Sequence, residues 1–182
     1  KYGGDMAVAS MSILNSIMQF VMLLLPGLVQ GAQPLLSYNL GAQNISRVKK
    51  TFRLLLICCV SGSFLIWLIC MTVPAAVTSI FTSDIALITY TNKSMRVYLA
   101  MLFIYGIQVA CQYSFVALDQ APKAIFLTIW RKIIILIPLI FILPHFMSDA
   151  VMGVYLAEPI ADTIAVCTTA PMFYCYYRKL KG

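Results

Sequence analysis

The chain has 182 residues, of which 62% are hydrophobic and only 10% are charged. A soluble domain carries about 25% charged residues, so this chain has too little charge to cover a surface that faces water. The net charge of +7 does not indicate nucleic-acid binding, because the cations lie in short clusters between apolar segments rather than on one face of a soluble module. The composition predicts an all-α polytopic membrane protein, with the lipid bilayer around it and no nucleic-acid partner.

Five apolar segments are each long enough to cross a membrane, since a spanning helix needs about 20 mainly apolar residues. We expect these spans at approximately residues 6–40, 51–81, 95–118, 124–146 and 150–177. The first is too long for one upright span, because at about 1.5 Å per residue it reaches about 50 Å, against a hydrocarbon core of about 30 Å. Tilting, or a kink at Pro26 or Pro34, would absorb the excess.

The positions of lysine and arginine predict how the spans are oriented. Ten of the cations are expected on one side of the membrane: Arg47, Lys49, Lys50, Arg53, Lys123, Arg131, Lys132, Arg178, Lys179 and Lys181. The other side holds Lys1, Lys93 and Arg96. The positive-inside rule therefore places the C-terminus in the cytoplasm and the N-terminus outside, as an odd number of spans requires.

The six cysteines all lie inside apolar segments, and none forms a CxxC pair or has a histidine at metal-ligand spacing. We therefore predict no metal site and no bound cofactor. The chain begins Lys1-Tyr2-Gly3, with neither a methionine nor a signal sequence. We expect it to be part of a longer protein.

The stretch Gly31–Asn44 (GAQPLLSYNLGAQN) places glycines, a proline, amides and hydroxyls at the cytoplasmic end of the first span. Buried backbone groups need partners in lipid, so this stretch should face the interior of a helix bundle. With the following Arg47-Val48-Lys49, it resembles the second helix of the C-terminal lobe of the MATE (multidrug and toxin extrusion) transporters. The segments Ile137–Pro144 and Gly153–Asp162 resemble the last two helices of that family.

The resemblance implies that residues 1–182 are a partial C-terminal transmembrane lobe, with five of the six helices of a MATE-type lobe. The family exports small organic cations in exchange for Na⁺ or H⁺, by alternating access between two lobes. It implies a transporter rather than an enzyme, a partner in the missing N-terminal lobe, and a location in the bacterial cytoplasmic (inner) membrane. A lipid-linked oligosaccharide flippase of the same superfamily and a non-catalytic membrane assembly subunit are the alternatives.

Three ionisable residues lie clearly within spans, where burial is expensive and a charge indicates function. Glu158 and Asp162 are four residues apart and therefore lie on one helix face, where they could share a proton or a cation. They are the candidate ion-coupling residues. The alternative is a structural ion pair of one carboxylate with Arg131, or a position near water at the outer membrane boundary. Arg131 either faces the substrate cavity or extends its side chain toward the cytoplasm.

Further polar residues within spans are candidates for lining a substrate cavity: Gln33, Asn39, Tyr105, Gln108 and Gln112. Gln108 and Gln112 lie one helical turn apart and form a polar stripe. Interhelical hydrogen bonds explain such residues at least as well as substrate contacts do. Tyr105 occupies the position at which some MATE relatives carry a coupling carboxylate, and this departure argues against coupling there.

Overall fold

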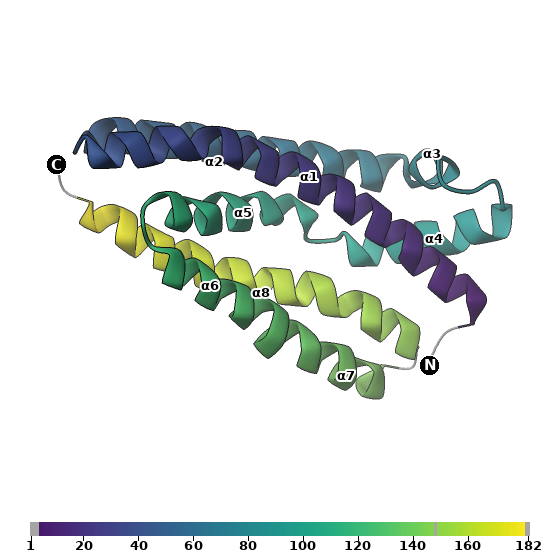
Figure 1. The fold of residues 1–182 in the computed structure, drawn as a ribbon. Coiled ribbons are helices and arrows are strands. Elements are labelled where there is room, and N and C mark those ends of the chain that lie inside the picture. The colour runs from purple at the N-terminus through teal and green to yellow at the C-terminus, as the bar shows by residue number, and fades with distance from the viewer. Residues whose placement is uncertain (1–3, 148, 181–182) are drawn as a thin grey trace.

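The computed structural model describes residues 4–147 and 149–180, and every regular element within them is helical (Figure 1). The elements are α1 (Asp5–Gly41), α2 (Ile45–Thr72), α3 (Pro74–Ser79), α4 (Ile85–Tyr98), α5 (Leu102–Ala117), α6 (Ala121–Ile129), the π-helical segment Trp130–Leu136, α7 (Ile137–Phe146) and α8 (Ala150–Lys179). The predicted all-α polytopic membrane fold is confirmed.

Within residues 4–147 and 149–180, four helical stretches are long and apolar enough to cross a membrane: α1, α2, the continuous stretch Ala121–Phe146, and α8. The helices α4 and α5 together form a fifth candidate span, which is bent by 50° at the short break between them. A count of five spans therefore requires α4 and α5 to cross the membrane as one bent element.

Helix boundaries differ from the expected spans where the sequence carries capping or breaking residues. The helix α2 ends at Thr72, because Pro74 disfavours continuing the preceding helix and instead begins α3. The helix α4 already begins at Ile85, ten residues before the expected third span. Its N-cap is Asp84, whose carboxylate accepts hydrogen bonds from the backbone N–H groups of Ala86 and Leu87.

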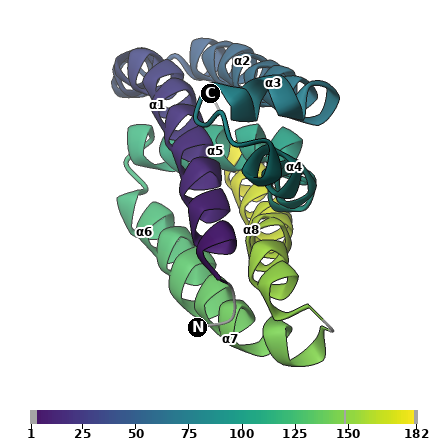
Figure 2. The same ribbon diagram turned by 90° about the vertical axis from the view of Figure 1, so that its right-hand side faces the viewer.

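The helix α5 lies at the centre of the bundle, between α1 and α2 on one side and α6 and α8 on the other (Figures 1 and 2). It packs most closely against α2 at Gly106, where an added Cβ would overlap the carbonyl oxygen of Cys59 and the hydroxyl of Ser63. The Ser63 hydroxyl donates a hydrogen bond to the carbonyl oxygen of Phe103, at 3.1 Å. A small residue at this point allows the two backbones to approach, as is typical of helix pairs in membranes.

We predict that Gly106→Ala destabilises the bundle by about 1–3 kcal/mol, because the new methyl group has to push α2 and α5 apart. The measurement is the thermal denaturation midpoint of the purified protein in detergent. Gly27→Ala is the matched control, since an added Cβ there meets nothing within 4 Å. Alanine is also favoured over glycine inside a helix. An equal fall in both variants would contradict the packing argument.

Candidate functional site

The candidate site is built around Arg131, which lies in the π-helical segment Trp130–Leu136. Such segments are rare and occur frequently at functional sites, because the wider turn points side chains in directions that an α-helix does not allow. Pro138 lies two residues beyond the end of this segment and has no N–H to donate to the carbonyl of Ile134. It is thus a local reason for the hydrogen-bond pattern to change here.

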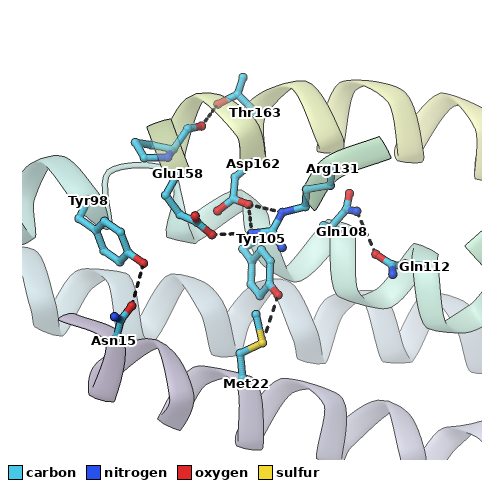
Figure 3. Close-up of polar contacts among 11 residues, drawn as sticks. Asn15, Met22, Tyr98, Tyr105, Gln108, Gln112, Arg131, Glu158, Asp162 and Thr163 are labelled. Atoms are coloured by element: carbon cyan, nitrogen blue, oxygen red, sulfur yellow. Dashed lines mark hydrogen bonds and ion pairs between the residues drawn. The ribbon is translucent and has the colours of Figure 1, made fainter. Parts of the chain in front are cut away.

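The guanidinium of Arg131 joins this segment to α8 through two carboxylates (Figure 3). Its Nε donates a hydrogen bond to Oδ1 of Asp162 at 2.7 Å, and its Nη2 donates to Oε1 of Glu158 at 2.9 Å. The side chains of Arg131 and Asp162 are 7% and 5% exposed, and that of Glu158 is 17% exposed. We call these three residues the ion-pair cluster.

The aromatic ring of Tyr105 completes the surroundings of this guanidinium from the side of α5. The Arg131 Cζ atom lies 5.2 Å from the ring centroid, a geometry in which a cation is attracted to the face of the ring. The phenol oxygen of Tyr105 points toward the Met22 sulfur on α1, at 3.9 Å. Tyr105 therefore extends from the ion-pair cluster to α1, and it supplies no carboxylate of its own.

The ion-pair cluster carries one formal negative charge when both carboxylates are ionised. Transferring charged groups from water into a protein interior costs free energy. This cost is offset only when the ion pair has good geometry and further hydrogen bonds satisfy the remaining polar atoms of the charged groups. The two short bonds to Arg131 satisfy part of this requirement. The sequence left open a structural ion pair of one carboxylate with Arg131. The structure contains such a pairing, and both carboxylates take part in it.

Two cavities border the ion-pair cluster, and Arg131, Lys132 and Met22 line both of them. The first, of about 290 Å³, lies among α1, α5, α6 and the π-helical segment. The second, of about 400 Å³, lies among α1, α4, α8 and the π-helical segment. Glu158 lines the second cavity, whereas Asp162 lines neither.

The first cavity brings together four of the predicted site residues: Tyr105, Gln108, Gln112 and Arg131. A hydrogen-bond chain runs along its wall, from Gln108 Nε2 to Gln112 Oε1 at 3.1 Å and from Gln112 Nε2 to the Thr128 hydroxyl at 2.6 Å. The buried Oε1 atom of Gln108 has no hydrogen-bond partner among the described residues. The same side chain thus bonds Gln112 through its nitrogen and leaves its buried oxygen without a partner among the described residues.

Gln33 and Asn39 are placed elsewhere, toward the C-terminal end of α1. Neither lines either of the two cavities. The Asn39 amide donates to the carbonyl oxygen of Leu35 within its own helix, at 2.7 Å. The geometry around Asn39 is that of a locally bonded helix residue.

Sequence reasoning missed Asn15, Gln19, Tyr98 and Lys132, all of which line the second cavity. The Tyr98 hydroxyl lies 3.4 Å from Oδ1 of Asn15 and links α4 to α1 (Figure 3). The sequence did indicate this face of α1, because the polar residues Asn15 and Gln19 lie at the helical spacing i and i+4, with Met22 at i+7. Polar residues at that spacing within an apolar span indicate a face that does not contact lipid.

We predict that Arg131→Met destabilises the protein by about 3–5 kcal/mol, because it leaves the buried carboxylate of Asp162 and the partly buried carboxylate of Glu158 without their cation. The triple variant Arg131→Met, Glu158→Gln, Asp162→Asn removes all three charges and should recover most of this loss. Thermal denaturation midpoints and the yield of folded protein in membranes measure both effects. If the triple variant were as unstable as the single one, the stabilisation would not come from charge pairing.

The chain resembles known proteins in both sequence and fold. The family model described as MatE matches residues 1–142. The chain is 28% identical over 177 residues to the multidrug export protein MepA of Staphylococcus haemolyticus, covering 95% of this chain and 37% of that protein. MepA of Staphylococcus aureus (strain NCTC 8325 / PS 47) gives the same identity and coverage. The chain thus spans little more than a third of the length of the curated relatives that it matches.

Among solved structures, the MATE multidrug transporter DinF-BH, solved in complex with a ligand, superimposes with a TM-score of 0.79 and 33% identity, over 87% of this chain and 35% of that one. An outward-facing MATE family transporter of the MOP superfamily gives a TM-score of 0.88 at 15% identity, over 98% of this chain and 40% of that one. The second likeness concerns the fold alone. Because the MatE model covers well over half of its residues, the chain belongs to the MATE family of membrane transporters.

Proposed function

We propose that this chain is the larger part of the C-terminal lobe of a secondary active exporter of small organic cations. In this proposal it works with an N-terminal lobe of the same transporter, and inward movement of Na⁺ or H⁺ drives export by alternating access. Support comes from the family, from relatives named as multidrug export proteins, and from the multidrug transporter DinF-BH among the solved structures. We place the protein in a bacterial cytoplasmic membrane with its C-terminus in the cytoplasm, because cations cluster at the N-terminal end of α2 and at the C-terminal end of α8.

The observation that carries this proposal is the ion-pair cluster at the edge of the second cavity. Two carboxylates and one guanidinium leave an excess negative charge in a membrane interior, where electrostatic attraction is stronger than in water. An organic cation that enters the cavity would meet the Glu158 carboxylate, together with Met18, Met22 and Tyr98 on the walls. Methionine adapts to varied shapes and aromatic faces attract cations, as a multidrug cavity requires.

Competition for this single negative charge provides a coupling mechanism. A proton or Na⁺ that neutralises the cluster removes the attraction for an organic cation, and the bound organic cation excludes the ion in return. Such mutual exclusion is reciprocal by thermodynamic linkage. Glu158 and Asp162 remain the proposed coupling residues, and Tyr105, Gln108, Gln112 and Arg131 remain the proposed cavity residues.

The flippase alternative has less support. A flippase that holds a pyrophosphate group would need cationic side chains free to bind it. The guanidinium of Arg131 is already bonded to two carboxylates, which leaves Lys132 as the cation without an ion pair on these cavity walls in the described part of the chain.

We predict that the full-length transporter lowers the accumulation of ethidium in an efflux-deficient bacterial host. Glu158→Gln and Asp162→Asn should each reduce this efflux by about tenfold, equivalent to about 1.4 kcal/mol, because each removes the excess negative charge. Whole-cell dye accumulation, with membrane expression verified for every variant, measures the effect. Unchanged accumulation of several cationic dyes by the unmodified transporter would contradict the export proposal.

Lys132→Gln is the matched control, because it removes a charge of opposite sign from the second cavity, which Glu158 also lines, without touching an observed ion pair. We predict that this variant binds ethidium at least as tightly as the unmodified transporter, measured by fluorescence titration of the purified protein. Inside-out membrane vesicles with an imposed Na⁺ gradient or an imposed pH gradient then identify the coupling ion. A fall in affinity in Lys132→Gln equal to that in Glu158→Gln would contradict the charge argument.

A further inference from the structure

A groove of about 360 Å³ lies among α2, α5 and α8, on a different side of α5 from the first cavity. The adjacent α5 positions show this division, because Gln108 and Gln112 line the first cavity whereas Ile107 and Cys111 line the groove. The rest of the groove wall is apolar or aromatic, apart from Arg53 and the hydroxyls of two tyrosines.

The groove ends in a cationic region, at the end of the bundle where α2 begins and α8 terminates (Figure 1). Arg53 is exposed and lines the groove, and it makes no ion pair within residues 4–147 and 149–180. The Lys49 ammonium lies 5.5 Å from the ring centroid of Tyr177, and the Arg178 guanidinium lies 5.8 Å from that of Tyr174. Both tyrosines also line the groove.

The region offers little negative charge to satisfy these cations. Among the described residues, the acidic side chain at this end of the bundle is Asp119, which lies in the turn between α5 and α6 and does not line the groove. Tyrosines beside basic residues are typical of the level at which lipid headgroups lie. The groove therefore combines a wall suited to hydrocarbon with an unneutralised positive end at the headgroup level.

We propose that this groove is a binding site for one anionic glycerophospholipid. Its phosphate would accept charge-assisted hydrogen bonds from Arg53, with Lys49 and Arg178 adding attraction from either side. One acyl chain would lie along Phe52, Leu56, Ala170 and Phe173. From Ala170 to Tyr177 the groove follows α8 for about 10 Å. This length is enough to hold the part of the acyl chain that lies nearest the headgroup.

An anionic lipid fits this groove better than a second protein chain does. A partner helix would have to supply an acidic group to Arg53 at the membrane surface, whereas every anionic lipid carries one at that level. The ring of Tyr174 and the side chain of Arg53 are exposed, so the groove is open at this end within residues 4–147 and 149–180. The occupant is thus identified by its charge and by its depth in the membrane.

The test is native mass spectrometry of the full-length transporter in detergent, titrated with phosphatidylglycerol or with phosphatidylcholine of the same acyl chains. We expect one phosphatidylglycerol molecule to remain bound preferentially. Arg53→Gln should lower this preference about fivefold, the effect of one cation near an anionic lipid surface. Arg47→Gln is the matched control, because Arg47 is an exposed arginine on the same helix that does not line the groove.

A second variant tests the apolar part without altering charge. Ala170→Phe fills the groove and should reduce binding of phosphatidylglycerol, while inorganic phosphate at the same concentration should neither bind nor compete. Equal retention of the two lipids, or equal losses in Arg53→Gln and Arg47→Gln, would overturn the proposal. Displacement of phosphatidylglycerol by inorganic phosphate would also overturn it, as would a second protein copy bound in place of lipid.

Discussion

The charge of Arg131 inside a membrane-spanning helix is the constraint on which the rest of this structure depends. A guanidinium there needs anionic partners, and both come from one face of α8. The pairing fixes the rotation of α8 relative to the π-helical segment and brings Tyr105 of α5 against the guanidinium. It also means that α8 and this segment move together as long as both bonds hold. In the proposed alternating-access cycle, the two therefore behave as one rigid unit unless a cation or proton weakens the pairing.

The central helix α5 separates two environments, and its sequence shows how. Gly106 permits close packing on α2, while Tyr105, Gln108 and Gln112 line the first cavity. Ile107 and Cys111 turn instead toward the groove. The polar side chains of α5 thus face a cavity between helices rather than the apolar groove, as buried polar groups in a membrane protein require. The small residue and the polar stripe depend on each other, because α5 is buried only if α2 can approach it.

Much of the fold follows from the sequence, whereas the site follows only in part. Apolar segments and basic clusters predicted a polytopic helical protein, and ionisable residues within spans identified Glu158, Asp162 and Arg131. The i, i+4 spacing placed the two carboxylates on one face, but it could not show that both reach one arginine across the bundle. The π-helical segment has no reliable local signature beyond Pro138. Gln33 and Asn39 lie outside the two cavities, and Asn39 shows that a polar residue within a span can also be satisfied through its own helix.

The two carboxylates are unequal, and the difference assigns them separate tasks in the proposed transporter. Asp162 is almost fully buried, bonds the Arg131 Nε and lines neither cavity, so its carboxylate is placed to hold the guanidinium in position. Glu158 is more exposed and lines the second cavity, so an entering cation meets it first. Neutralising Glu158 leaves Arg131 balanced by Asp162 alone, with no net charge. The cluster thus has two states of different charge that keep one ion pair intact, and exchange of an ion for an organic cation needs such a pair of states.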